Sequence, residues 1–245
     1  MSVAARAFPF GSEEPHETPD QITRIRQQTD WGALLPPEAQ STSWRLQQAV
    51  KRIADVMLAA FGLLVLAPVF VIVAILIRMK SPGPVFYEWR VLGRHARPFI
   101  GYKFRTMVID ADLQKAHFIE RNEMNGPVFK IRDDPRVTPF GRWLRRYSID
   151  ELPQLWSVLK GDMSLVGPRP PAPEEFVQFE PWQRGKLAVT PGITCLWQVG
   201  GRSEITEFDE WAALDLEYIR QWSLWLDVKI LLRTIPAVVR ARGAY

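Results

Sequence analysis

Two adjacent carboxylates, Asp150 and Glu151, stand at the start of a predicted helix in the segment SIDELPQLWSVLKG. In such a pair, one carboxylate can attack phosphorus while another holds Mg²⁺. The partial positive charge of a helix N-terminus favours an ionised carboxylate and offers free N–H groups to a phosphate. The pair therefore indicates phosphoryl chemistry. The alternative is a capping box between Ser148 and Glu151 that serves only to start the helix.

Several basic residues near this pair could neutralise a diphosphate. They are Arg145, just before the pair; Arg169, in the proline-rich loop VGPRPP; and Lys103 and Arg105, in the segment YKFRTM. Arginine suits this task because its planar guanidinium can donate two parallel hydrogen bonds to a phosphate. The alternative is that these side chains only face lipid headgroups.

A second carboxylate pattern, Asp110-Ala111-Asp112, follows the apolar residues Met107-Val108-Ile109. An apolar strand that ends in Asp-x-Asp can hold a metal and a nucleotide diphosphate in a glycosyltransferase. The same residues are equally typical of an exposed helix over 110–121. A metal-dependent glycosyltransferase that uses Asp110 and Asp112 is therefore an alternative function.

The net charge of +4 over 245 residues is unevenly distributed along the chain. Residues 51–160 carry 18 basic and 10 acidic side chains, whereas the flanking segments are slightly acidic. A basic middle segment suits anionic lipid headgroups or phosphate substrates, and a non-catalytic lipid-binding scaffold is a further alternative. The single cysteine, Cys195, excludes an intramolecular disulfide. A membrane segment argues against nucleic acid as the partner.

That membrane segment is the uncharged apolar run Val56–Ile77. As a helix its 22 residues would reach about 33 Å, which is the thickness of a bilayer core. Basic residues lie at both of its ends (Lys51, Arg52, Arg78 and Lys80), whereas a spanning helix carries its basic excess on the cytoplasmic side. Pro68 can bend the segment. The residues alone leave two topologies open, a re-entrant hairpin and a kinked spanning helix.

The remaining elements follow from local patterns in the sequence. Residues 1–43 predict a disordered tail, and a helix begins at Trp44. Strands are expected over 85–92, 98–104 and 126–131, and aromatic-rich helices over 207–222 and 226–241. Thr138 is the expected N-cap of the helix that carries Phe140, Trp143 and Leu144.

Taken in order, the longer segments resemble one known family. These segments are KRIAD before an apolar run with a central proline, SPGPVFY, YKFRTM, DDPRVT, GRWLRRYSIDELPQLWSVLKGDMSLVGPRP, PGITCLWQVGGR, LDLEYI and WSLWLDVKILLRT. The chain resembles the bacterial sugar transferases, which are monotopic polyprenyl-phosphate phosphoglycosyltransferases. The resemblance covers about residues 51–245 and is specific, because many segments match in order.

The resemblance implies a reaction at the cytoplasmic face of the bacterial inner membrane. A sugar 1-phosphate passes from a UDP-sugar to polyprenyl (undecaprenyl) phosphate, and UMP is released. By resemblance, Asp150 is the nucleophile that forms a covalent phosphosugar intermediate, and Glu151 is a Mg²⁺ ligand. The predicted substrate-binding residues are Lys103, Arg105, Arg136, Arg145, Arg169 and Arg202. Such a reaction is the first membrane step in the biosynthesis of a polysaccharide, such as an exopolysaccharide, or of a glycoconjugate.

The predicted fold is α+β and mainly helical, in a monotopic membrane protein. It consists of a disordered tail (1–43), a re-entrant membrane helix broken at Pro68 (44–80) and a small cytoplasmic catalytic domain (81–245), with amphipathic interfacial helices. Re-entry is preferred over spanning because both substrates are met at one membrane face. The sequence does not define the sugar, and homo-oligomer formation is left open.

Three positions depart from the family pattern. Ala67 precedes Pro68 where the family has serine, Cys195 stands where many members have glycine, and Trp89-Arg90-Val91 replaces a Gln-x-Arg. The first change keeps the proline bend but removes a hydroxyl group. The second affects a tight turn, and the third affects the contacts with the substrate.

Overall fold

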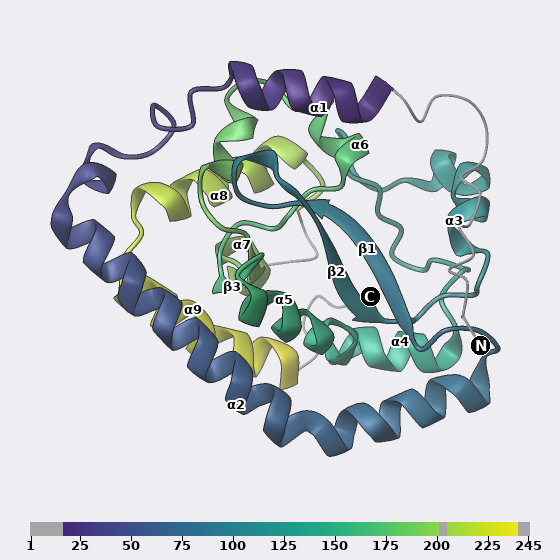
Figure 1. Cartoon of the computed structure of the whole chain (residues 1–245). Coiled ribbons are helices and arrows are strands. Elements are labelled where there is room, and N and C mark those ends of the chain that lie inside the picture. The colour runs from purple at the N-terminus through teal and green to yellow at the C-terminus, as the bar shows by residue number, and fades with distance from the viewer. Residues whose placement is uncertain (1–16, 201–204, 240–245) are drawn as a thin grey trace, which may run out of the picture.

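One long helix, α2 (Thr42–Lys80), runs along the edge of the molecule, and the rest of the chain is built against it (Figure 1). The computed structural model describes residues 17–200 and 205–239. The other α-helices are α1 (Glu17–Gln28), α3 (Ala111–Gln114), α4 (Pro139–Arg146), α5 (Leu155–Lys160), α6 (Pro173–Phe176), α7 (Leu196–Gly200), α8 (Phe208–Arg220) and α9 (Leu224–Val239). The 3₁₀ helices are η1 (Pro37–Gln40), η2 (Arg94–Ala96), η3 (Lys115–Arg121), η4 (Ile149–Gln154) and η5 (Gln183–Ala188). The strands are β1 (Phe86–Leu92), β2 (Pro98–Phe104), β3 (Ser164–Val166) and β4 (Gly192–Thr194). The chain is thus mainly helical with small sheets, as predicted.

Helix α2 starts at an N-cap, where the Ser41 hydroxyl accepts a hydrogen bond from the Trp44 backbone N–H at 3.2 Å. Pro68 lies inside the helix and does not end it, and the ribbon changes direction between its two halves (Figure 1). In its most apolar window only 11% of the helix is buried against the protein. Among the described residues, α2 is the one helix long and apolar enough to cross a membrane.

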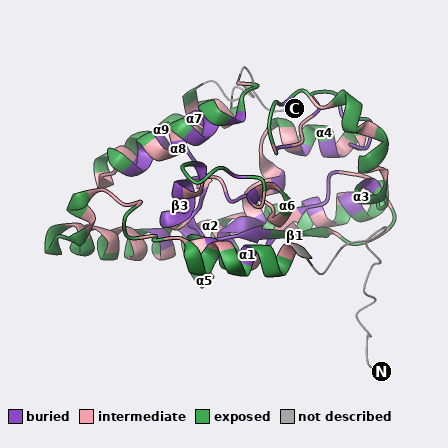
Figure 2. Ribbon diagram, turned by 90° about the horizontal axis from the view of Figure 1, so that it is seen from above, coloured by how far each residue is buried: buried purple, intermediate pink, exposed green. Residues whose placement is uncertain are grey.

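Large apolar side chains are exposed along α2 and α9, which favours a membrane-associated protein. On α2 the exposed side chains include Leu46, Ile53, Met57, Phe61, Leu64, Ile72, Ile75 and Met79. On α9 they recur every three or four residues, as expected for one face of a helix, at Trp225, Val228, Leu232, Ile235 and Val239. Figure 2 shows exposed residues along both helices.

The predicted strands over 85–92 and 98–104 form an antiparallel hairpin, β1–β2, with Phe86 opposite Phe104 and Leu92 opposite Pro98. The turn between them places His95 and Ala96 in the left-handed region, at φ 56° and 53°. A second pair, β3 and β4, is parallel and was not predicted, since each strand has only three residues.

The prediction of a disordered tail is wrong for residues 17–43. Helix α1 packs on the core through Ile22, which is 9% exposed, and through Ile25. Trp31 stacks on His95 of the hairpin turn, with ring centroids 5.4 Å apart. The sequence pattern does not predict this helix, because only two apolar residues of α1 face the core in an otherwise polar segment. Residues 1–16 lie outside the described part of the chain.

The predicted strand over 126–131 is also wrong. The Asn122 side chain holds this segment as a loop: it donates to the carbonyls of Met124 and Val128 and accepts from the Lys130 N–H. The expected helix over 110–121 is a single α-helical turn, α3, followed by the 3₁₀ helix η3. Thr138, in contrast, caps α4 as predicted, accepting from the Gly141 N–H at 3.0 Å.

Candidate active site

The carboxylates Asp150 and Glu151 lie on η4, directly before α5. The chain reverses between α4 and η4 at Ser148, whose φ of 51° is left-handed. The Glu151 N–H then donates to the Ser148 carbonyl at 3.2 Å. In this conformation the Ser148 side chain makes no capping bond at the start of η4. The alternative of a capping box between Ser148 and Glu151 is therefore wrong, and the pair stands on a 3₁₀ turn rather than in the first turn of an α-helix.

Asp150 is buried, at 9% exposure, and Arg145 provides nearby positive charge. Burial lowers the pKa of Arg145, while the negative charges of Asp150 and Asp134 act in the opposite direction. The Arg145 Nε donates to the Thr106 hydroxyl at 2.9 Å, which fixes the guanidinium. Arg145 thus brings positive charge to the buried Asp150, an arrangement that suits a carboxylate that attacks phosphorus.

Glu151 meets the hairpin through Lys103, whose Nζ lies 2.9 Å from the Glu151 Oε1. The same ammonium lies 4.3 Å from the centroid of the Trp89 ring. These groups border a shallow cleft lined by Trp89, Lys103, Glu151, Gln154, Arg169, Pro170, Gly192, Ile193 and Gln198. The cleft thus combines a carboxylate of the pair with two of the predicted substrate-binding cations, Lys103 and Arg169.

Arg169 reaches this cleft from a loop that is bonded to strands on both sides. The Gly192 N–H donates to the Pro168 carbonyl at 2.9 Å, and the Leu92 N–H donates to the Pro171 carbonyl at 3.0 Å. A Cβ at Gly192 would lie 2.0 Å from the Gly167 nitrogen, so only glycine allows this approach. The Arg169 guanidinium lies 5.6 Å from the centroid of the Trp89 ring.

Two predicted substrate-binding arginines are engaged elsewhere in the chain. Arg105 donates to the carbonyls of Ser81 at 2.8 Å and of Pro82, which ties the end of α2 to β2. Arg136 is 5% exposed and makes two hydrogen bonds to the Asp134 carboxylate, at 2.9 and 2.6 Å. The guanidinium groups of both arginines therefore donate hydrogen bonds to other groups of the protein. Arg202 lies outside the described residues.

The alternative carboxylates also bond within the protein. Asp110 accepts from the Gln114 amide at 2.8 Å, and the Tyr87 hydroxyl lies 3.4 Å from the Asp112 Oδ1. Burial, followed by the charge of Asp112, raises the pKa of Tyr87 to about 12. Within residues 17–200 and 205–239, no three Asp, Glu, His or Cys side chains gather into a metal cage. Asp110 and Asp112 are not in the cleft beside Glu151.

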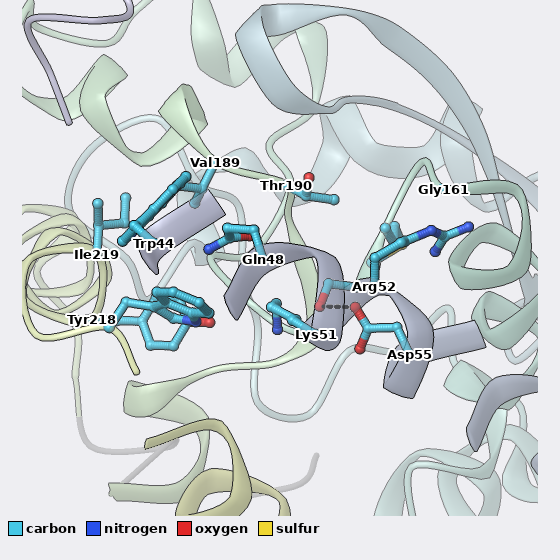
Figure 3. Close-up of a pocket in the computed structure, with 13 residues that line it drawn as sticks. Trp44, Gln48, Lys51, Arg52, Asp55, Gly161, Val189, Thr190, Tyr218 and Ile219 are labelled. Atoms are coloured by element: carbon cyan, nitrogen blue, oxygen red, sulfur yellow. Dashed lines mark hydrogen bonds between the residues drawn. The ribbon is translucent and has the colours of Figure 1, made fainter. Parts of the chain in front are cut away.

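A larger hollow, of about 80 Å³, lies at the start of α2 and not at the carboxylate pair (Figure 3). Its charged groups are engaged within the protein. Lys51 pairs with Asp227 at 2.6 Å, and Asp55 accepts from the Ser164 hydroxyl at 2.7 Å. Arg52 extends toward Gly161 (Figure 3). These contacts attach α2 to the remainder of the chain.

Sequence reasoning missed several residues of the site. Gln154 is 2% exposed and lines the cleft, three residues after Glu151 on the same short helix. Gln198 comes from α7, and Thr106 positions Arg145. The spacing of Gln154 from Glu151 was a usable signal, but the other two are brought in by long-range packing.

The comparisons with known proteins show the family to which the chain belongs. Residues 46–241 match the model of the bacterial sugar transferase family. The chain is 46% identical over 194 residues to the galactosyl transferase CpsE of Streptococcus agalactiae, covering 79% of this chain and 43% of that protein. It is 39% identical over 199 residues to the exopolysaccharide production protein ExoY of Sinorhizobium fredii, covering 80% of this chain and 88% of ExoY. It is 42% identical over 213 residues to the undecaprenyl-phosphate glucose phosphotransferase of Komagataeibacter xylinus, covering 80% of this chain and 37% of that enzyme. The chain thus spans about two-fifths of two of these relatives and most of the third.

Proposed function

Because the chain belongs to the bacterial sugar transferase family, we propose that it transfers a sugar 1-phosphate from a UDP-sugar to polyprenyl phosphate and releases UMP. The observation that carries the proposal is the placing of Asp150 and Glu151 on η4 among Lys103, Arg145 and Arg169. The printed names of relatives, undecaprenyl-phosphate galactose phosphotransferase among them, support the reaction class. The product is the first lipid-linked sugar of a polysaccharide or glycoconjugate.

In the proposed first step, an Asp150 oxygen attacks the phosphorus that carries the sugar. The bond from that phosphorus to the bridging oxygen breaks, UMP leaves with the electron pair, and a phosphosugar is bound covalently to Asp150. In the second step an oxygen of polyprenyl phosphate attacks the same phosphorus and restores the carboxylate. Arg145 compensates the charge of Asp150 between the steps, and Lys103 and Arg169 neutralise the diphosphate.

The residues present fit a magnesium ion held partly by the substrate. Mg²⁺ is bound through one or two carboxylates together with phosphate oxygens and water rather than by a full protein cage, and Glu151 at the cleft offers such a carboxylate. When bound, the ion supplies positive charge to the diphosphate. Since the Glu151 Oε1 contacts Lys103 at 2.9 Å, metal binding requires this pair to open or to share the carboxylate.

We also propose that α2 enters and leaves the membrane by one face, with the site on the cytoplasmic side of the inner membrane. Both halves of α2 pack on the same body. In the first half, Arg52 donates to the carbonyls of Val158 and Leu159. In the second half, Ile77 packs with Phe104 and Leu144. A straight spanning helix would carry its two ends to opposite sides of the bilayer, away from such a shared body.

The topology is tested by cysteine labelling in intact inverted vesicles. A single cysteine at Ser43 or at Ser81, in a Cys195→Ser background, should react with an impermeant maleimide from the same side. Reaction of the two positions from opposite sides would show that α2 spans.

The reaction is tested with purified protein, undecaprenyl phosphate and a panel of UDP-sugars that includes UDP-glucose and UDP-galactose. UMP should appear only with Mg²⁺, and Asp150→Asn should abolish its release. A trapped phosphosugar adduct should map to Asp150 by mass spectrometry. Release of UDP instead of UMP would favour the glycosyltransferase alternative through Asp110 and Asp112. Lipid binding without turnover of any donor would favour the scaffold alternative.

A further inference from the structure

One aromatic side chain of the cleft, Trp89, lies against both of its cations. The Lys103 Nζ is 4.3 Å and the Arg169 guanidinium carbon 5.6 Å from the centroid of the Trp89 ring. Both distances fall within the range in which a cation is attracted to the electron-rich face of an indole, the strongest aromatic partner. The two cations come from distant parts of the chain, β2 and the loop after β3, and they meet at this ring.

The hairpin register explains how Trp89 comes to this position. Trp89 pairs with Gly101 across the hairpin, and Lys103 lies two residues further along β2 on the same face. A Cβ at Gly101 would lie 3.6 Å from the Trp89 ring, so the ring extends over the glycine. The register thus places the indole and the Lys103 side chain on the same face of the hairpin.

Both cations have competing partners that would draw them elsewhere. Lys103 pairs with Glu151 at 2.9 Å, the carboxylate that the proposed function assigns to the metal. Burial raises the pKa of the Glu175 and Asp215 carboxyls, and the positive charge of Arg169 acts to lower both pKa values. Arg169 therefore lies within electrostatic range of both carboxyls. The neutral ring attracts both cations without cancelling their charge. A carboxylate in its place would consume the charge that a diphosphate needs.

We propose that Trp89 is a positioning residue whose ring holds Lys103 and Arg169 together at the cleft, so that both cations meet the diphosphate of the donor. This inference rests on the proposed function. The ring also gives Lys103 a second contact besides Glu151, which would keep the ammonium in the cleft if Glu151 held a metal ion. A tryptophan that served only to fill space over Gly101 would do so equally well whether the negative charge on its ring face were weaker or stronger.

The experiment compares Trp89→Leu and Trp89→Phe with the parent and with Trp182→Leu, a control tryptophan that contacts Glu180 and does not line the cleft. We measure the KM for the UDP-sugar, kcat for UMP release, and the Kd of UDP by calorimetry. Loss of two cation–π contacts should raise KM and Kd by about tenfold in Trp89→Leu. Trp89→Phe, which keeps an aromatic face, should stay within about threefold. Trp182→Leu should match the parent.

A graded series separates attraction to the ring from packing of the ring. Fluorinated tryptophans placed at residue 89 keep the indole shape but weaken its negative face. The Kd of UDP should rise with each added fluorine. An unchanged Kd across the series would overturn the inference, even if Trp89→Leu failed to fold. Equal impairment of Trp89→Phe and Trp89→Leu would also overturn it.

The two proposals fail in different ways. If the parent releases no UMP from any donor, the proposed function fails, and the inference is then judged on UDP binding alone. If the parent is active and the fluorinated series binds UDP with constant affinity, the proposed function stands and the role of Trp89 is refuted.

Discussion

The ion pair between Lys51 and Asp227 attaches the start of α2 to α9, and its removal should strongly destabilise the protein. The two side chains are only 11% and 9% exposed, with 2.6 Å between the Nζ and the Oδ2. Asp227 also accepts from the Tyr218 hydroxyl at 2.8 Å and from the Trp222 indole N–H at 3.2 Å. In Asp227→Asn, the ammonium keeps the Val166 carbonyl, at 3.0 Å, but loses its counter-charge.

Breaking a buried ion pair from one side costs about 3–5 kcal/mol. Since Lys51 is still slightly exposed, we take the lower end, about 3 kcal/mol. For a chain of this size, each kcal/mol lowers the melting temperature by about 2–4 °C. The expected fall is therefore about 6–12 °C. It is measured by fluorescence-detected melting in one detergent at one scan rate, because unfolding of such a protein is irreversible.

The chain offers a matched control in the exposed pair Lys160–Asp162, at 2.7 Å, with side chains 39% and 31% exposed. Exposed pairs contribute at most about 1 kcal/mol, so Asp162→Asn should lower the melting temperature by less than about 4 °C. The double variant Lys51→Met/Asp227→Leu should recover much of the loss, because it removes both charges. Equal shifts for Asp227→Asn and Asp162→Asn would refute the reasoning that burial makes this pair important.

Three further predictions concern packing and pH. A Cβ at Gly62 would lie 3.2 Å from a leucine methyl group of α5, so Gly62→Leu should lower kcat at least tenfold by separating α2 from α5. The exposed control Ala60→Leu should leave both kcat and membrane binding unchanged. Although burial acts to raise it, the hydrogen bonds and charge of Arg136 lower the pKa of Asp134. The contribution of Asp134 to stability is therefore present above the unfolded pKa of about 4, and it is lost as the pH falls through the lower folded pKa. Asp134→Asn should flatten the acid side of a plot of melting temperature against pH. Ile22→Asp should lower the melting temperature by about 4–8 °C, since burying an unpaired carboxylate costs at least about 2 kcal/mol; an unchanged value would show that α1 does not pack on the core in solution.

The elements that sequence reasoning predicted correctly are those with strong local signals. Short apolar and aromatic segments identify the strands β1 and β2, and the hydroxyl of Thr138 before Pro139 identifies the start of α4. The apolar run identifies α2. Its bend and topology do not follow from local pattern, because Pro68 is compatible with a kink in a spanning helix as well as with re-entry.

What the sequence could not resolve is the partner of each charged side chain. In the sequence, Arg105 and Arg136 are as suitable for binding phosphate as Arg169 is. Yet the first two donate to the chain itself, to the Ser81 carbonyl and to Asp134. A guanidinium binds a carbonyl, a carboxylate or a phosphate by the same geometry, so only tertiary structure separates these cases. The β3–β4 pair was missed for a related reason: three-residue strands have no periodicity to read.

The short helix α5 connects the apolar helix α2 to the carboxylate pair Asp150 and Glu151, so no flexible linker is needed between them. Its first residue follows η4, which carries Asp150, and the carbonyls at its other end accept from Arg52 of α2. Its side packs on Ala59 of α2 through Leu155 and Val158. Six residues of helix rise only about 9 Å, so the Asp150 carboxylate, the proposed nucleophile, is held at a short, fixed distance from the apolar helix. If the acceptor presents its phosphate at the membrane surface, α5 holds the site at the height where the reacting phosphorus meets that phosphate. The lipid then does not have to leave the bilayer.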